Sequence, residues 1–163
     1  MNLVVRPADP AADWPAIWPI LEAVVRPGEA YAVDRDIDEA RGRAYWFSPA
    51  HEVFVAEADG RILGSYYMRP NQGGGGAHVA NCGYMTDPAA QGRGVARTMG
   101  LHSLEHARAR GYRAMQFNIV VSTNVRAVRL WESLGFQTVG RLPGAFAHPR
   151  LGDVDALVMH QHL

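Results

Sequence analysis

Hydrophobic residues alternate in the first half of the chain in the way that predicts strands. This period of two is found in LVVRPA near the start, and again in HEVFVAEA, RILGSYYMR and HVANCGYMT. Between the first two strands, Asp13 can cap a helix that begins at Trp14, and a weaker helical stretch follows over residues 34–47. Because Asp59-Gly60 is a strong hairpin signal, we expect neighbouring strands here to be antiparallel.

The pattern changes to helical spacing in the second half, after Asp87-Pro88 stops the fourth strand. The first helix there has one face of small residues that can lie close to a sheet, made of Ala96, Gly100, Leu104 and Ala107. The second has an apolar stripe made of Ala127, Leu130, Trp131 and Leu134. AMQFNIVV, between the helices, predicts a buried strand, and FQTVGRL and VDALVMHQ predict two more. The fold class is therefore α/β with a mixed sheet, with strands first and then β-α-β-α-β-β.

Composition and charge narrow the function. The chain has 163 residues, 48% of them hydrophobic and 20% charged, which is typical of one folded domain over residues 1–163. The formal net charge is zero and the basic residues are dispersed, so we expect no binding to nucleic acid or to an anionic membrane, and a small-molecule partner instead. No apolar run approaches the length of a membrane helix.

Several chemistries are excluded by what the sequence lacks. All sixteen basic residues are Arg, so Schiff-base catalysis and the phosphate-binding lysine of a P-loop are ruled out. The one cysteine, Cys82, cannot form an internal disulfide, and the N-terminus has no charged segment followed by an apolar signal core. We therefore expect a cytoplasmic protein.

A glycine-rich loop at the start of the small-residue helix is the clearest candidate for a binding site. In QGRGVAR, Gly92 and Gly94 allow backbone N–H groups to converge on an anion at a helix N-terminus. The loop is not a Walker A motif, which needs a Lys, and Arg97 stands where a dinucleotide-binding fingerprint has its third glycine. On these residues alone, a phosphate-binding loop and a plain turn both remain open.

Two motifs, in the right order, resemble those of the GNAT acetyltransferase superfamily. Its Q/R-x-x-G-x-G/A signature is matched by Gln91, Gly94 and Ala96 in TDPAAQGRGVA. Its second motif, an Asn that opens a helix ending in Leu-Gly-Phe, is matched in NVRAVRLWESLGF. The resemblance covers essentially the whole chain. It implies a six- or seven-stranded mixed, mostly antiparallel and splayed sheet, flanked by about four helices.

The resemblance also implies a co-substrate and a reaction. Enzymes of this family transfer an acetyl group from acetyl-CoA directly to a neutral amine in a ternary complex, without an acylated side chain. Their loop amides hold the CoA pyrophosphate, and the preceding strand pairs with the pantetheine arm. This assigns cofactor binding to Met85, Thr86, Gln91, Gly92, Arg93, Gly94, Val95, Ala96, Arg97 and Asn124. The alternative is a CoA-binding sensor or structural subunit without turnover.

The chain departs from the family at the residue that usually protonates the leaving thiolate. Most members have a Tyr in the second motif, and Trp131 stands at that position, where we expect it to pack. Asn118 in the preceding strand and Asn124 at the helix start offer uncharged amide donors, and they are our catalytic candidates. Asn124 also suits an N-cap. No carboxylate is an obvious base, so water is expected to deprotonate the amine.

A closer resemblance is to fungal acetyltransferases that act on azetidine-2-carboxylate and related cyclic amino acids, through Asn81, Asn118, Asn124 and WESLGF. It implies that the acceptor is a small amine, for instance an amino acid, with Asn81 as a substrate-binding residue. His148 and Arg150, in the predicted loop AFAHPRLGD, could meet a carboxylate and close over it. The alternatives are a solvated Asn81 on a strand edge and an ordinary loop.

Two competing chemistries rest on single features. HSLEH, from His102 to His106, matches the H-x-x-E-H motif of zinc peptidases and raises a zinc-dependent hydrolase as an alternative. Both histidines are expected to project opposite the small-residue face, towards solvent, without a third ligand, so we expect no metal. Cys82 in its strand is expected to fill space and not to carry an acyl group. The sequence leaves a homodimer open.

Overall fold

One mixed sheet of seven strands organises the chain, and the computed structural model describes all 163 residues. The strand order is β1-β2-β3-β4-β5-β7-β6, and every neighbouring pair is antiparallel except β4 and β5. The strands are β1 (Val4–Pro7), β2 (Glu52–Ala58), β3 (Arg61–Pro70), β4 (Val79–Thr86), β5 (Ala114–Val121), β6 (Gln137–His148) and β7 (Gly152–His162). The predicted mixed, mostly antiparallel sheet is confirmed.

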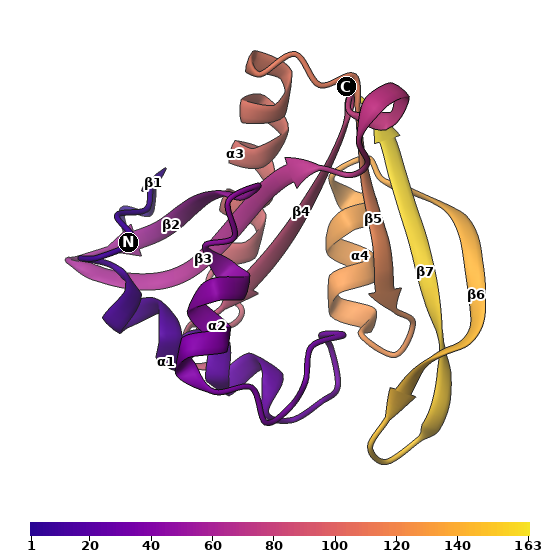
Figure 1. Ribbon diagram of the computed structural model, residues 1–163, viewed down its shortest axis with the longest axis horizontal. Helices are drawn as coiled ribbons and strands as arrows, with labels where there is room; N and C mark the ends of the chain where they lie inside the picture. Colours follow the sequence, from indigo (N-terminus) through magenta and orange to yellow (C-terminus); the bar gives the residue numbers. More distant parts are fainter.

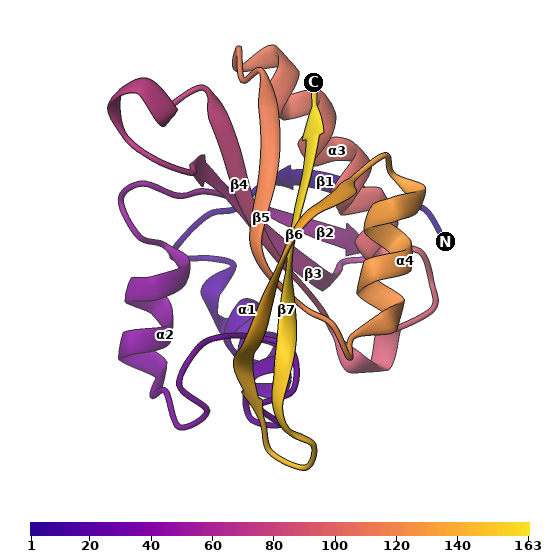
Figure 2. The same cartoon turned by 90° about the vertical axis from the view of Figure 1, so that its right-hand side faces the viewer.

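Four α-helices cover the two faces of this sheet (Figure 2). They are α1 (Trp14–Val25), α2 (Glu39–Trp46), α3 (Val95–Ala109) and α4 (Val125–Ser133). Helices α1 and α2 form one apolar core with β2 and β3, in which Trp46 is fully buried. Helices α3 and α4 form a second core around Met99. None of the helices combines the length and the apolar character needed to cross a membrane.

The sheet opens between its two parallel strands. β4 and β5 are in register only at Val79↔Ala114 and Ala80↔Met115, and beyond these pairs they separate (Figure 1). β4 stays paired with β3, while β5 stays paired with β7. One consequence is that Ile119, in the strand predicted to be buried, is 44% exposed at the gap. The gap is the place in the fold where a ligand can meet unpaired strand backbone.

Local sequence features explain the hairpin, but one predicted cap is replaced by an ion pair. The Asp59-Gly60 turn joins β2 to β3 with positive φ angles of 53° and 75°, as a two-residue hairpin of this type requires. Asp13 stands at the start of α1, yet its carboxylate does not cap the helix and instead accepts hydrogen bonds of 2.8 and 3.0 Å from Arg6. Arg6 also pairs with Glu57 at 2.8 Å, so the network ties β1 to α1 and β2.

The two histidines of HSLEH do not project into solvent as expected. His102 Nδ1 lies 2.7 Å from the hydroxyl of Tyr66, and His106 Nε2 lies 3.1 Å from the carboxylate of Glu52. The prediction was wrong because α3 buries a wider face than the small-residue stripe, which brings both rings against the sheet. No group of three or more His, Cys, Asp or Glu residues is arranged to hold a metal ion.

Candidate functional site

The opening of the sheet leaves one edge of β4 without a partner strand. Along an antiparallel strand, the backbone groups of successive residues point alternately to the two neighbouring strands. Val79 and Asp87 both bond to the β3 side, so the odd-numbered residues of β4 bond to β3 and the even-numbered ones face the gap. The backbone N–H and C=O groups of Cys82 and Tyr84 therefore point away from β3, at a level where β5 has already separated. An extended ligand can bind such an edge as an added strand.

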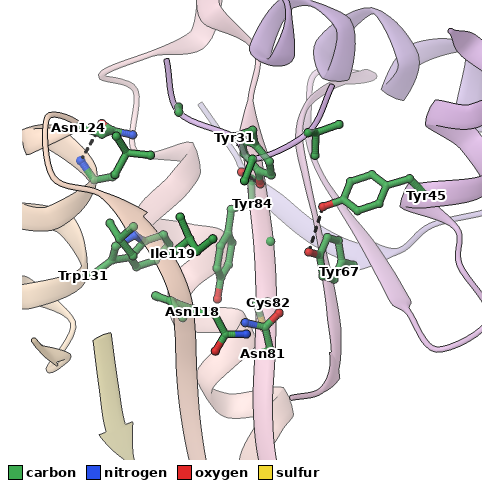
Figure 3. A pocket seen from close by; sticks show the side chains of 18 residues that line it. Tyr31, Tyr45, Tyr67, Asn81, Cys82, Tyr84, Asn118, Ile119, Asn124 and Trp131 are labelled. Carbon is green, nitrogen blue, oxygen red and sulfur yellow. Dashed lines mark hydrogen bonds between the residues drawn. The ribbon is translucent and has the colours of Figure 1, made fainter. Parts of the chain in front are cut away.

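A pocket of about 290 Å³ lies in this gap (Figure 3). Its walls come from segments that are far apart in the sequence, namely residues 30–33, Tyr45, Tyr67, residues 81–84, residues 117–121 and helix α4. None of the 18 residues that line it is charged. The pocket therefore suits a small ligand with an apolar body, whose charged groups are met only at the rim.

Four tyrosines reach the pocket, and none of them was predicted as a site residue. Tyr31 donates a hydrogen bond to the backbone carbonyl of Tyr84, and the hydroxyl of Tyr84 lies 2.6 Å from that of Ser103 on α3. The hydroxyls of Tyr45 and Tyr67 are 3.2 Å apart (Figure 3). Burial raises the pKa of each of the four phenols, so all of them are protonated at neutral pH.

Sequence signals could have found some of these tyrosines but not all. Tyr67 and Tyr84 stand in alternating strands, and alternation places each on a definite face of the sheet. Tyr45 lies in the weakly periodic stretch that became α2. Tyr31 lies in the connection between α1 and α2, where no periodic pattern predicts the direction of a side chain. Only the packing of that connection over the gap brings Tyr31 to the pocket.

Two small residues of β4 form the floor of the pocket. Burial raises the pKa of the Cys82 thiol to about 12, so it is not a thiolate at neutral pH and is poorly suited to carry an acyl group. Gly83 leaves room for the ring of Tyr67, because a Cβ at this position would lie only 2.5 Å from Tyr67 Cε1. The floor is therefore shaped by packing and offers no nucleophile.

Asn81 and Asn118 lie where the two strands begin to separate, and both already have partners. Asn81 Nδ2 donates to the carbonyl of Gln116 at 2.9 Å, which bridges β4 and β5. Asn118 Nδ2 donates to Asn71 Oδ1 at 2.7 Å, and Asn118 Oδ1 accepts from Gln116 Nε2 at 2.9 Å. Both predicted residues thus line the pocket, and each also holds neighbouring parts of the protein in place.

Asn124 and Trp131 form the wall that α4 contributes. Asn124 Oδ1 accepts a hydrogen bond of 3.3 Å from Ala127 N, so the residue is the N-cap that its position suggested, and its Nδ2 donates to no protein acceptor. The indole of Trp131 packs on Tyr84 and Phe117, with ring centroids 4.7 and 4.8 Å apart. Trp131 is only 7% exposed, which supports a packing role.

His148 and Arg150 do not line the pocket. The segment AFAHPRLGD, predicted to be a loop, belongs mostly to β6 and β7, and only residues 149–151 turn between them. His148 is buried, and its Nδ1 accepts the amides of Arg150 and Leu151, both at 3.2 Å. Arg150 pairs with Glu29 at 3.0 Å. The loop prediction was wrong because β6 resumes its pairing with β7 beyond an irregularity that absorbs the Pro and Gly residues.

The glycine-rich loop has the geometry of an anion-binding site. Gly92 and Gly94 adopt positive φ angles of 76° and 81°, and Gly94 is the N-cap of α3. Five backbone amides donate to no protein acceptor, namely those of Gly92, Gly94, Val95, Ala96 and Arg97. Free amides that converge at a helix N-terminus are the usual partners of phosphate oxygens.

Side chains join this loop to α4. Gln91 Oε1 accepts from Arg126 at 3.2 Å, and Arg97 donates to Ser133 Oγ at 3.1 Å. Arg93 belongs to the loop itself and is exposed. The three guanidinium groups place positive charge around the free amides, which favours a ligand that carries several negative charges.

The two strand residues predicted to pair with pantetheine differ in orientation. Thr86 follows the alternation of the residues that face the gap. Met85 instead bonds to β3 through its backbone, and its side chain is buried in the core beneath α1. Of the pair, only Thr86 presents backbone groups to the open edge of β4.

Comparisons with known proteins agree on a family. Residues 14–136 match the acetyltransferase (GNAT) family. N-acetyltransferase aca1 of Schizosaccharomyces pombe is 32% identical over 123 residues, which are 71% of this chain and 56% of the relative. The chain thus spans little more than half the length of this curated relative.

Solved structures extend the likeness to the whole chain. A GCN5-related N-acetyltransferase from Kribbella flavida is 46% identical with a TM-score of 0.93, covering 99% of this chain and 98% of that one. The protein yncA of Salmonella typhimurium, solved with its cofactor acetyl-CoA, is 26% identical with a TM-score of 0.86, covering 100% of this chain and 95% of that one. Both the family match and the splayed seven-stranded sheet lead to the same conclusion: the chain belongs to the acetyltransferase (GNAT) family.

Proposed function

We propose that the protein transfers an acetyl group from acetyl-CoA to the amine of a small molecule, by direct attack in a ternary complex. The observation that carries this proposal is the continuity of the site. The free amides of residues 92–97 come shortly after the open edge of β4, and side chains of this loop bond to α4, which lines the pocket. One ligand can therefore bind by its phosphates at the loop and end in the pocket, where a second ligand can reach it.

The loop and the strand edge suit acetyl-CoA in different ways. Pyrophosphate oxygens can accept from the free amides of residues 92–97, with Gln91 and Arg93 in the same loop. The amides of a pantetheine arm can pair with the open edge at Tyr84 and Thr86. We assign to Asn124, whose Nδ2 has no protein acceptor, a contact with the cofactor or with the reacting groups.

The pocket suits a small acceptor that is apolar apart from its amine and one other polar group. Its lining is aromatic and aliphatic with a few amides, and it has no carboxylate that would hold an ammonium. A cyclic amino acid of the azetidine-2-carboxylate type, or another small amino acid, has these properties. We propose that Asn81 contacts the acceptor through its Oδ1, and that Asn118 and Asn124 orient the reacting groups.

An acceptor carboxylate needs a cation, and we assign this role to Arg69. Arg69 is opposite Asn81 in the register of β3 and β4, so both side chains lie on the same face of the sheet. Arg69 forms no ion pair, whereas Arg150 is already paired. Burial raises the pKa of Tyr45, and the charge of Arg69 partly offsets this rise, which places the guanidinium near the phenols of the pocket. Arg69 lies outside the pocket lining, as the two hairpin residues do, but unlike Arg150 it forms no ion pair, so we assign the carboxylate contact to Arg69 in their place.

An amine panel tests the proposed function. Release of CoA is measured with cyclic and acyclic amino acids, their carboxamides, simple amines, aminoglycosides and peptides, and binding of acetyl-CoA is measured by calorimetry. Turnover of small amines is the expected result. Binding of acetyl-CoA without turnover of any amine would identify a CoA sensor instead. Turnover of only aminoglycosides or peptide termini would contradict the small-substrate assignment while leaving the family unchanged.

Two variants then test the acceptor contacts. Arg69→Gln is expected to raise the KM of an amino acid about tenfold and to leave that of its carboxamide unchanged, with exposed Arg108→Gln as the matched control.

Asn81→Ala is expected to raise the acceptor KM or to lower kcat while acetyl-CoA affinity stays nearly intact. Equal weakening of both ligands would show that Asn81 acts only through its bridge to Gln116.

A further inference from the structure

The structure places a phenol across the gap from α4, whose own wall carries an indole instead. By the family resemblance, Trp131 stands where most members have a tyrosine, and its indole is packed against Tyr84 and Phe117. We propose that Tyr31, from the connection between α1 and α2, supplies the proton that the leaving CoA thiolate needs. The inference rests on the proposed acetyl transfer, and it adds a catalytic residue that neither motif contains.

The hydroxyl of Tyr31 lies at the open edge of β4. It donates to the carbonyl of Tyr84, one of the groups that point into the gap because β5 has separated. The ring of Tyr84 is in contact with Trp131, so the Tyr31 hydroxyl and the α4 wall flank the same stretch of strand (Figure 3). A thioester bound along this edge would therefore come within reach of Tyr31 from the side opposite α4.

The connection that carries Tyr31 is held in place on both sides. Arg26 and Arg35 bond to each other's backbone carbonyls and close the base of the connection. Glu29 pairs with Arg150 of the β6–β7 hairpin at 3.0 Å, two residues before Tyr31. A side chain that is fixed in this way loses little further freedom when a ligand arrives, which favours a role in positioning or proton transfer.

The hydroxyls of the other three pocket tyrosines bond to side chains and not to the open edge of β4. The hydroxyl of Tyr84 lies 2.6 Å from that of Ser103 on α3, in the second core and away from the open edge. The hydroxyls of Tyr45 and Tyr67 bond to each other at 3.2 Å, on the side of β3. Of the four, only Tyr31 has its hydroxyl on a backbone group of the gap.

In this reaction Tyr31 acts as a general acid towards the CoA sulfur. The amine nitrogen forms a bond to the thioester carbonyl carbon, the C–S bond breaks, and its electron pair stays on sulfur. A thiolate is a stronger acceptor than an amide carbonyl, so the O–H of Tyr31 can turn from Tyr84 to the sulfur and give it the proton. The resulting phenolate takes up, through water, the proton that the amine loses. Burial raises the pKa of Tyr31, so the phenol enters the reaction protonated.

The test compares Tyr31→Phe with Tyr66→Phe, the loss of a buried hydroxyl that lies beside His102 outside the pocket. For Tyr31→Phe we expect kcat to fall about 100-fold to 1000-fold, while acetyl-CoA affinity changes less than about threefold. For Tyr66→Phe we expect kcat to stay close to that of the wild type.

A second readout does not need turnover. The pKa of the thiol of bound CoA is followed by the ultraviolet absorbance of its thiolate, and Tyr31→Phe is expected to raise it because a donor to sulfur is lost. Nearly full activity of Tyr31→Phe, or an unchanged thiol pKa, would overturn the assignment. Loss of acetyl-CoA binding and of thermal stability together would also overturn it, in favour of a structural tether. If no amine is turned over but the thiol pKa shifts, the proposed function fails and the contact with sulfur stands.

Discussion

The glycine-rich loop and the pocket both adjoin α4, yet they are built in different ways. The loop is one continuous segment, residues 91–97, and it presents backbone amides to a ligand. The pocket draws its lining from residues between 30 and 131, and it presents side chains. The first is a local structure that needs only its own sequence and a helix behind it. The second exists only when the whole sheet is assembled.

This difference teaches where variation can be tolerated. An anion held by backbone amides is indifferent to most side chains, provided that the glycines keep their positive φ angles. A ligand held by side chains depends on each of them and on the packing that orients them. Cofactor binding and acceptor choice can therefore be changed separately, and the following variants test how separate they are, from the largest expected effect to the smallest.

The largest effect is expected at the loop. Gly94→Glu places a side chain at a φ angle of 81° and adds a negative charge beside the free amides. We expect acetyl-CoA affinity to fall at least about 100-fold, measured by calorimetry. The fold itself should persist, because no atom lies within 4 Å of a Cβ at this position. Undiminished affinity would show that the loop does not hold the cofactor.

The next effect is expected at the floor of the pocket. Gly83→Ala brings a methyl group within 2.5 Å of the ring of Tyr67, so the ring has to move. We expect the acceptor KM to rise about tenfold and stability to fall by about 1–3 kcal/mol, with acetyl-CoA affinity little changed. Gly73→Ala, where nothing lies within 4 Å, is the control. A parallel loss of acetyl-CoA binding would show that the two regions are not separable.

Asp13 lies outside both the loop and the pocket, so a substitution there shows what a loss of stability alone does to the two ligand affinities. The guanidinium of Arg6 holds the pKa of Asp13 in the folded protein below its value in the unfolded chain. The carboxylate therefore stabilises the fold at any pH above its pKa in the unfolded chain. This stabilisation is lost as the pH falls through the pKa of the folded state. We expect Asp13→Asn to lower the free energy of unfolding by about 1–2 kcal/mol at neutral pH. The difference from wild type should disappear in strong acid, and both ligand affinities should stay unchanged. A constant difference across the pH range would contradict the ion-pair explanation.

The smallest effect is expected at the wall between the two regions. Trp131→Phe removes an indole that packs on Tyr84 and Phe117 but keeps an aromatic ring in its place. We expect kcat to stay within about threefold of wild type, because packing is largely preserved. A loss of about a thousandfold would instead mark the indole as the proton donor, and would remove the need for Tyr31.

Secondary structure was predictable wherever one local signal dominated. The Asp59-Gly60 hairpin and the positive φ angles of Gly92 and Gly94 follow from glycine's freedom and from the residues beside it. The direction of His102 and His106 did not follow, because it depends on how broad a face α3 buries against the sheet.

For several candidate site residues, the sequence predicted the segment that lines the site but did not predict which groups these residues contact. The three asparagines line the pocket. Two of them also bond within the protein, because Asn81 donates to a backbone carbonyl of β5 and Asn118 donates to Asn71. His148 was expected on a loop that closes over the substrate, and instead it caps a tight turn between two long strands. Such partners come from other elements, so no local pattern contains them.

The sequence by itself determined the order of strands and helices, the glycine loop and the family that its motifs resemble, because periodicity, turn residues and capping act over a few neighbouring positions. Only the tertiary structure decided where β4 leaves β5, which backbone groups that opening exposes, and that Tyr31 reaches the carbonyl of Tyr84. The physical reason is distance along the chain. Tyr31 and Tyr84 are 53 residues apart, and what joins them is the packing of α1 and its connection on the sheet.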